Sequence, residues 1–148
     1  MARTIACDGG YLLDTCVLSE LVKPAPDRGL IGWLEATDER RLYLSALTLG
    51  KLAKGVARLA SGERQRRLQT WLDEDLSRRF VGRILSVDRH VALRWGELQA
   101  QAERRGRPMP VIDALLAATA AVHALTVVTR NGGDMAESGV TTVNPWSP

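Results

Sequence analysis

The chain has only two cysteines and two histidines among its 148 residues. Cys7 and Cys16 have a spacing that fits neither a metal site nor a disulfide framework, which favours a reducing cytoplasm. His90 and His123 fall on separate predicted helices, where a histidine is more often a packed or solvated side chain than a ligand. The sequence therefore offers no Cys and His set for a zinc site.

Long apolar runs are also missing, since no uninterrupted stretch approaches the roughly 20 residues that cross a bilayer. We therefore expect no membrane association. Residues 1–10 carry one basic residue and no apolar block, which is not the pattern of a signal peptide. We expect a flexible N-terminal extension there. Residues 11–148 show no repeat, linker or low-complexity tract, so they are expected to form a single domain with a core of its own.

The charge of the chain is mildly basic, with a formal net charge of +3. The arginines are clustered at positions 64, 66 and 67, at 78, 79 and 83, and at 104, 105 and 107. Such clusters fit contact with phosphates, although a solvated helix face is the commoner explanation of any one of them. The charge is therefore compatible with a nucleic-acid partner without demonstrating one.

Apolar runs and helical spacings alternate along the chain. Strands are predicted at residues 11–13, 41–44, 83–85, 125–129 and 140–143. Helices are predicted between them, with Asp14, Asp27, Ser45 and Asp88 at four of the helix starts and an alanine-rich helix at residues 111–124. This alternation predicts an α/β fold with a mainly parallel central sheet of about four to five strands, flanked by helices on both faces.

Three aspartates share one placement in this predicted fold. Asp14 ends the first strand, Asp113 lies in the first turn of the alanine-rich helix, and Asp134 follows a strand and a glycine turn. Ligands of open parallel sheets bind at the carboxyl ends of the strands, where such residues converge. Taken singly, each acid has a simpler explanation as a helix cap, which contributes about 0.5–2 kcal/mol, or as a turn residue.

A cluster of carboxylates needs a cation, because the like charges repel one another. Oxygen ligands without sulfur or imidazole suit Mg²⁺, with Mn²⁺ as a substitute. Asp14, Asp113 and Asp134 are therefore candidate ligands of such an ion.

Four segments together resemble the VapC-type toxin ribonucleases of the PIN-domain superfamily. They are LDTCVLSEL at 13–21, LSALTLGKLAKG at 44–55, PVIDALLAATA at 110–120 and VTRNGGDM at 128–135, followed by NPW at 144–146. The match is in the right order and runs over nearly the whole chain. The resemblance implies a PIN-like domain, metal-dependent cleavage of RNA phosphodiesters, a VapB-like antitoxin as partner, and a homodimer in the cytoplasm. It also implies that Asp14, Asp113 and Asp134 are the metal-binding and catalytic residues. Thr15 and Asn131 are then candidates for orienting water or the acids, although capping and turn formation explain them too.

The chain departs from the pattern of that family at three positions. Cys16 stands where asparagine is usual, and Met135 stands where an aromatic residue is usual. Lys51 replaces a glutamate of the second motif, which changes the local charge by two units. Helical spacing places Lys51 on the same side as Leu47 and Gly55.

Two consequences of Lys51 remain open from the sequence. Its ammonium either pairs with Asp14 or Asp113 and competes with the metal, or it reaches solvent and only deletes one ligand. Our hypothesis is a fold and antitoxin binding that are retained, with nuclease activity weakened or lost. The alternatives are a catalytically inactive partner that binds an antitoxin in a DNA-binding repressor complex, and a housekeeping RNA-processing nuclease.

Overall fold

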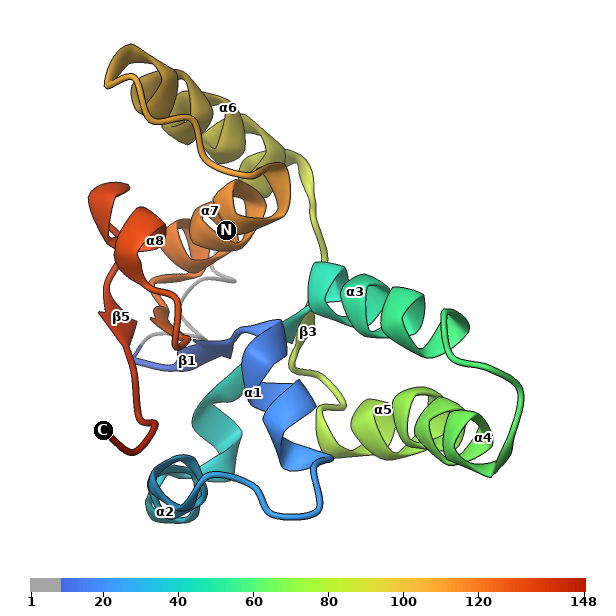
Figure 1. Ribbon diagram of the computed structural model, residues 1–148. Coiled ribbons are helices and arrows are strands. Elements are labelled where there is room, and N and C mark those ends of the chain that lie inside the picture. The colour runs from blue at the N-terminus through green and yellow to red at the C-terminus, as the bar shows by residue number, and fades with distance from the viewer. Residues whose placement is uncertain (1–8) are drawn as a thin grey trace.

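The structure is a computed structural model that describes residues 9–148, apart from the side chain of Asp134. The described residues form one five-stranded sheet in which neighbouring strands are parallel (Figure 1). The strand order is β3-β2-β1-β4-β5. The bounds are Tyr11–Leu13 for β1, Leu42–Ser45 for β2, Ile84–Leu85 for β3, Thr126–Val128 for β4 and Thr142–Val143 for β5. The predicted parallel sheet is confirmed.

The central strands are apolar on both sides, because successive side chains of a strand point to opposite faces. Leu12 and Val127 are partners in the register of β1 and β4, and both belong to one apolar core. The next pair along the same strands, Leu13 and Val128, belongs to a second core on the other face. A strand buried on both faces reads as a continuous apolar run, which is why these strands are recognisable in the sequence.

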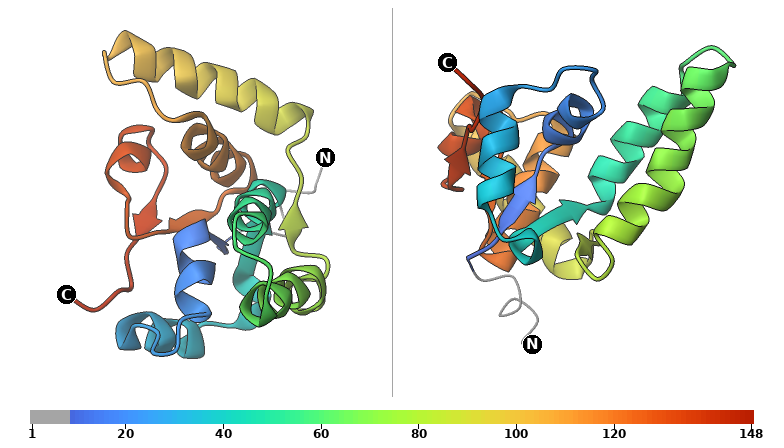
Figure 2. Two further views of the ribbon diagram at one scale, coloured as in Figure 1. Left: turned by 45° about the vertical axis from the view of Figure 1, so that its right-hand side comes forward. Right: turned by 90° about the horizontal axis from the view of Figure 1, so that it is seen from below.

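Helices cover both faces of the sheet, as predicted. On the face of the first core lie α6 (Arg89–Arg104), α7 (Val111–His123) and α8 (Gly133–Glu137). On the face of the second core lie α1 (Thr15–Leu21), α2 (Arg28–Ala36), α3 (Ala46–Ala57), α4 (Glu63–Thr70) and α5 (Leu76–Arg79). Views from two further sides show the same division (Figure 2).

Helix α3 and the long helix that follows it form an antiparallel pair that extends away from the sheet (Figure 2). The long helix consists of α4, a π-helical turn at Trp71–Asp75 and α5. Buried Leu52 and Val56 of α3 and Leu72 and Leu76 of the long helix hold the pair together within the second core. One side of α3 is therefore packed and the opposite side stays open.

The predicted helix starts are confirmed by their capping hydrogen bonds. The side chains of Asp27, Ser45 and Asp88 each accept a backbone N–H of the following turn at 3.0 Å. Each such cap satisfies a backbone donor that the helix itself leaves unpaired. These bonds depend on neighbours in the chain, so the sequence pattern was sufficient to find them.

Two local features differ from the expectation. The second strand begins at Leu42, because Arg41 belongs to a 3₁₀ turn at Glu39–Arg41 that Asp38 caps. The glycine turn after β4 leads into the short helix α8, which already begins at Gly133, so Asp134 lies within a helical turn. Neither feature has an apolar period that distinguishes it from a loop.

The predicted flexible extension at residues 1–10 falls mostly outside the described residues. At its end, the carbonyl of Gly10 accepts the backbone N–H of Thr126 at 3.0 Å. Among the residues that the structure describes, no helix is long and apolar enough to cross a membrane.

Candidate active site

The carboxyl edge of the sheet collects the polar residues that follow the strands. Asp14 comes directly after β1, Ser45 ends β2, and Thr129 comes directly after β4. All three are buried, with no more than 7% of their surface exposed. In a parallel sheet this edge is where ligands bind, because the chain diverges there into loops and helix starts.

Asp14 is held in place by both its backbone and its carboxylate. Its backbone N–H donates to the carbonyl of Val128 at 3.0 Å, so the residue extends the pairing of β1 with β4. Its Oδ1 accepts the N–H of Thr15 at 2.7 Å and caps α1. Its Oδ2 accepts the hydroxyl of Thr129 at 2.8 Å. Oδ1 still has a lone pair for a further partner, because Thr15 is the one donor that it accepts among the described residues.

Thr129 is a residue of this site that was not predicted from the sequence. Besides donating to Asp14, its hydroxyl accepts the backbone N–H of Asn131 at 3.0 Å. The hydroxyl therefore connects the aspartate after β1 to the loop after β4. Its position in the sequence could have indicated this role, because Thr129, like Asp14, directly follows a buried strand.

The thiol of Cys16 completes this group of hydrogen bonds. Its Sγ lies 3.8 Å from Oδ2 of Asp14 and 3.8 Å from the hydroxyl oxygen of Thr129. Burial raises the pKa of the Cys16 thiol, and the charge of Asp14 raises it further. The thiol is therefore protonated at neutral pH and donates weakly to Asp14, at the position where asparagine is usual in the family that the sequence resembles.

Asp113 is placed at the same edge of the sheet by the direction of α7. That helix ends at His123, just before the start of β4, so it runs back along the sheet for about 20 Å. Its first turn, with the half-buried Asp113, therefore lies toward the carboxyl ends of the strands. The backbone of Asp134 lies in α8, directly after the loop that follows β4, whereas its side chain is outside the described part of the chain.

The oxygen donors of this edge fit a hard divalent cation. Asp14 and Asp113 supply carboxylates, and the hydroxyl oxygen of Thr15 is buried without a hydrogen-bond partner among the described residues. An unpartnered buried oxygen next to a carboxylate is a natural position for a ligand or an ordered water. Among the described side chains, no three His, Cys, Asp or Glu form a group that could hold a metal ion. Asp134 is not among these side chains, because its own lies outside the described part of the chain.

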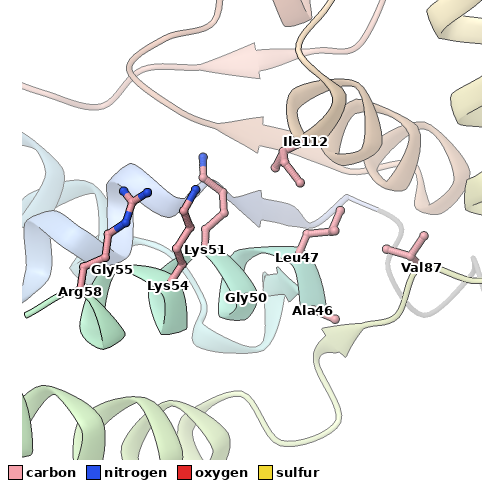
Figure 3. A pocket seen from close by; sticks show the side chains of 9 residues that line it. All are labelled: Ala46, Leu47, Gly50, Lys51, Lys54, Gly55, Arg58, Val87 and Ile112. Carbon is pink, nitrogen blue, oxygen red and sulfur yellow. The ribbon is translucent and has the colours of Figure 1, made fainter.

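Lys51 lies on the open side of α3, and its predicted direction is confirmed. Leu47, Lys51 and Gly55 all line a groove of about 660 Å³, with Ile112 of α7 on the facing wall (Figure 3). The side chain of Lys51 is exposed, and it takes part in no ion pair within the described residues. Because Ile112 precedes Asp113 in the chain, the ammonium group shares the groove with the first turn that carries this acid.

Comparison with known proteins agrees with this geometry. The sequence profile of the PIN domain matches residues 11–137. Toxin FitB of Neisseria gonorrhoeae is 37% identical over 135 residues, which cover 91% of this chain and 97% of that protein. VapC ribonuclease Y4jK of Sinorhizobium fredii is 36% identical over 137 residues, covering 93% of this chain and 98% of that protein.

The fold agrees with a solved structure as well. The structure of FitAB bound to an IR36 DNA fragment contains a chain that superposes with a TM-score of 0.88 at 34% identity. The superposition covers 93% of this chain and 96% of that chain. The chain belongs to the PIN-domain family, among the VapC-type proteins.

Proposed function

We propose that this protein is the toxin component of a type II toxin-antitoxin pair, built as a metal-dependent endoribonuclease. The observation that carries the proposal is the buried Asp14 at the carboxyl edge of the sheet, oriented from two sides by Thr15 and Thr129. Relatives of similar length are a toxin and a VapC ribonuclease. The substrate in this proposal is RNA, cleaved at its phosphodiester bonds.

Asp14, Asp113 and Asp134 are the proposed ligands of Mg²⁺ or Mn²⁺. When bound, such an ion lowers the pKa of a water molecule and stabilises the charge that develops on the phosphate. The chain's own residues prepare the site. Thr129 donates to one oxygen of Asp14 and Thr15 donates to the other, so the carboxylate is held in a single orientation. A fixed ligand loses little conformational entropy when it binds.

Lys51 weakens this activity in our proposal. Its ammonium group lines the groove beside the first turn of α7, where the family carries a carboxylate. A positive charge near the acids opposes the approach of a divalent cation, since like charges repel. The nuclease of the chain as written is therefore attenuated relative to a form with glutamate at this position.

The partners follow from the same family membership. FitAB is a complex in its solved structure, and it is bound to DNA there. For this chain we propose a VapB-like antitoxin and a homodimer, in the cytoplasm where its RNA substrate is found. A second candidate function is a catalytically inactive subunit of a DNA-binding repressor complex. The lysine in the groove favours it, because Lys51 leaves the packed side of α3 intact while changing the charge of the site.

Cleavage of RNA by purified variants tests the proposal. We expect weak or no cleavage by the chain as written, strong Mg²⁺- or Mn²⁺-dependent cleavage by Lys51→Glu, and none by Lys51→Glu combined with Asp14→Asn. Arg104→Glu is the matched control, because it makes the same charge change at an exposed cation that lines neither groove, and it should cleave as the written form does. Equal cleavage by the written form and Lys51→Glu would refute the attenuation. Absence of cleavage in every form, on total RNA and on tRNA, would favour the inactive repressor subunit.

A further inference from the structure

Three cations form a row on the open side of α3. Lys54 and Arg58 follow Lys51 by three and seven residues, so the three side chains share one side of the helix. All three are exposed and line the groove of about 660 Å³, and their side chains extend to the same side (Figure 3). Within the described residues, none of the three has an acidic partner in an ion pair.

A second groove of about 530 Å³ continues this positive surface between α1, α3 and α4. It shares Lys51 and Gly55 with the first groove. Its other charged lining residues are Lys23, Arg64 and Arg67. No acidic residue is among the described residues that line either groove. The three lysines of the whole sequence all lie on these two walls, with Lys51 where the grooves meet.

The wall between the cations is open. Gly50 and Gly55 both line the first groove, and a Cβ atom added to either would meet nothing within 4 Å. The first groove also has apolar contacts to offer, from Leu47, Val87 and Ile112. A ligand can therefore approach the helix closely while its charged groups reach the lysines and the arginine.

We propose that Lys51, Lys54 and Arg58 form a binding site for the phosphate groups of single-stranded RNA that works without a divalent metal ion. This inference rests on the proposed function only in taking RNA as the polyanion. The row extends about 10 Å along the helix axis and continues into the second groove, so it matches a chain of phosphates better than one small anion. An amphipathic peptide with acidic side chains is the other macromolecule that such grooves take, and it is a possible outcome of the test.

The proposal makes Lys51 act in opposite directions on binding and on cleavage. A carboxylate at this position repels the phosphates and leaves their neutralisation to a metal ion. The ammonium group attracts the phosphates directly, which replaces that contribution to binding. Lys51→Glu is therefore expected to weaken RNA binding in EDTA, even though the same change is expected to increase cleavage in Mg²⁺.

Fluorescence anisotropy of a labelled single-stranded RNA in EDTA tests the site. We expect Lys51→Gln, Lys54→Gln and Arg58→Gln each to raise Kd about fivefold, the size of one exposed charge contact in water. The triple variant should reduce the slope of log K against log salt by about 2, from about 0.7 for each phosphate contact on a single strand. Arg104→Gln is the matched control, an exposed cation near the end of α6 with no ion pair in the described residues, and it should bind as the parent does.

Three results would overturn the inference. The first is that the triple variant binds RNA in EDTA as tightly as the parent does. Another is an equal loss in Arg104→Gln, which would indicate general charge attraction. The third is tighter binding of poly-glutamate than of the RNA at equal charge concentration and salt, which would assign the site to acidic peptides. If RNA binding depends on Lys51, Lys54 and Arg58 while no variant cleaves RNA, the binding site is supported and the nuclease is contradicted. If Lys51→Glu cleaves RNA while binding does not depend on these three residues, the nuclease is supported and the binding site is contradicted.

Discussion

The acid at the sheet edge and the cations on α3 border the same site but are held in different ways. Asp14 is buried, forms a backbone bond to β4 and accepts hydrogen bonds on both carboxylate oxygens. Lys51, Lys54 and Arg58 are exposed and are held only by the helix that carries them. We therefore expect substitution of the acid to lower the stability of the fold as well as to change the site, whereas substitution at Lys51 changes mainly the charge of the site.

This difference explains how a chain can keep a PIN-domain fold while one motif position changes its charge. The packed side of α3 carries Leu52 and Val56, and these contacts do not involve Lys51. The charge of an exposed side chain can be reversed at little cost, because such a side chain contributes little to the stability of the fold. A substitution on the open side of α3 therefore changes the function of this site at a lower cost in stability than a substitution of the acid after β1.

The largest expected effect is on metal affinity. Lys51→Glu replaces a repelling ammonium with a carboxylate, so Mn²⁺ should bind about 10- to 100-fold more tightly, the range that ligand-shell changes produce in metal sites. Isothermal titration calorimetry of the purified variants measures this without any substrate. Lys54→Glu should give a smaller gain, and an equal gain in both variants would show that only the overall charge matters.

The next effect is on stability. Thr129→Val removes the hydroxyl that donates to Asp14 and leaves a buried carboxylate oxygen without this partner, so it should lower the free energy of unfolding by about 1–3 kcal/mol. Urea denaturation measures the loss. The exposed Thr141→Val makes the same chemical change and should lose far less. In an Asp14→Ala background the effect of Thr129→Val should shrink, and an undiminished effect would show that the bond is not its origin.

A smaller effect is expected on the other side of the comparison. Lys54→Met and Arg58→Met should each change the free energy of unfolding by no more than about 0.5 kcal/mol, because both side chains are exposed without ion pairs in the described part of the chain. The same urea titration measures it. A loss of unfolding free energy comparable to that of Thr129→Val would show that these cations stabilise the fold, which would contradict the view that their role is to bind a ligand.

The smallest effect concerns the thiol beside Asp14. Burial and the Asp14 charge raise the pKa of Cys16, so the reactive thiolate forms only at a pH above that of a free cysteine. In a Cys7→Ser background, alkylation by iodoacetamide should therefore begin at a higher pH than in a cysteine peptide. Asp14→Asn should lower this onset only partly, since burial is the larger cause. An onset equal to that of the peptide would place Cys16 in contact with solvent.

Local signals were enough for most of the fold. The apolar runs of β1 and β4 and the caps Asp27, Ser45 and Asp88 each depend on residues close together in the chain, and all were predicted. The short helix α8 and the 3₁₀ turn before β2 were missed, because neither is long enough to show a period. The site was predicted as a set of separate acids, by placement and by resemblance to a family.

The sequence by itself determined the α/β order, the acids after the strands and the lysine in the second motif. Only the tertiary structure decided which side chains meet. Thr129 reaches Asp14 across 115 positions of the chain because β4 pairs with β1, a contact that no local pattern encodes. It also decided that Lys51 meets solvent and a groove instead of a carboxylate among the described residues, since that depends on how α3 packs through its opposite side.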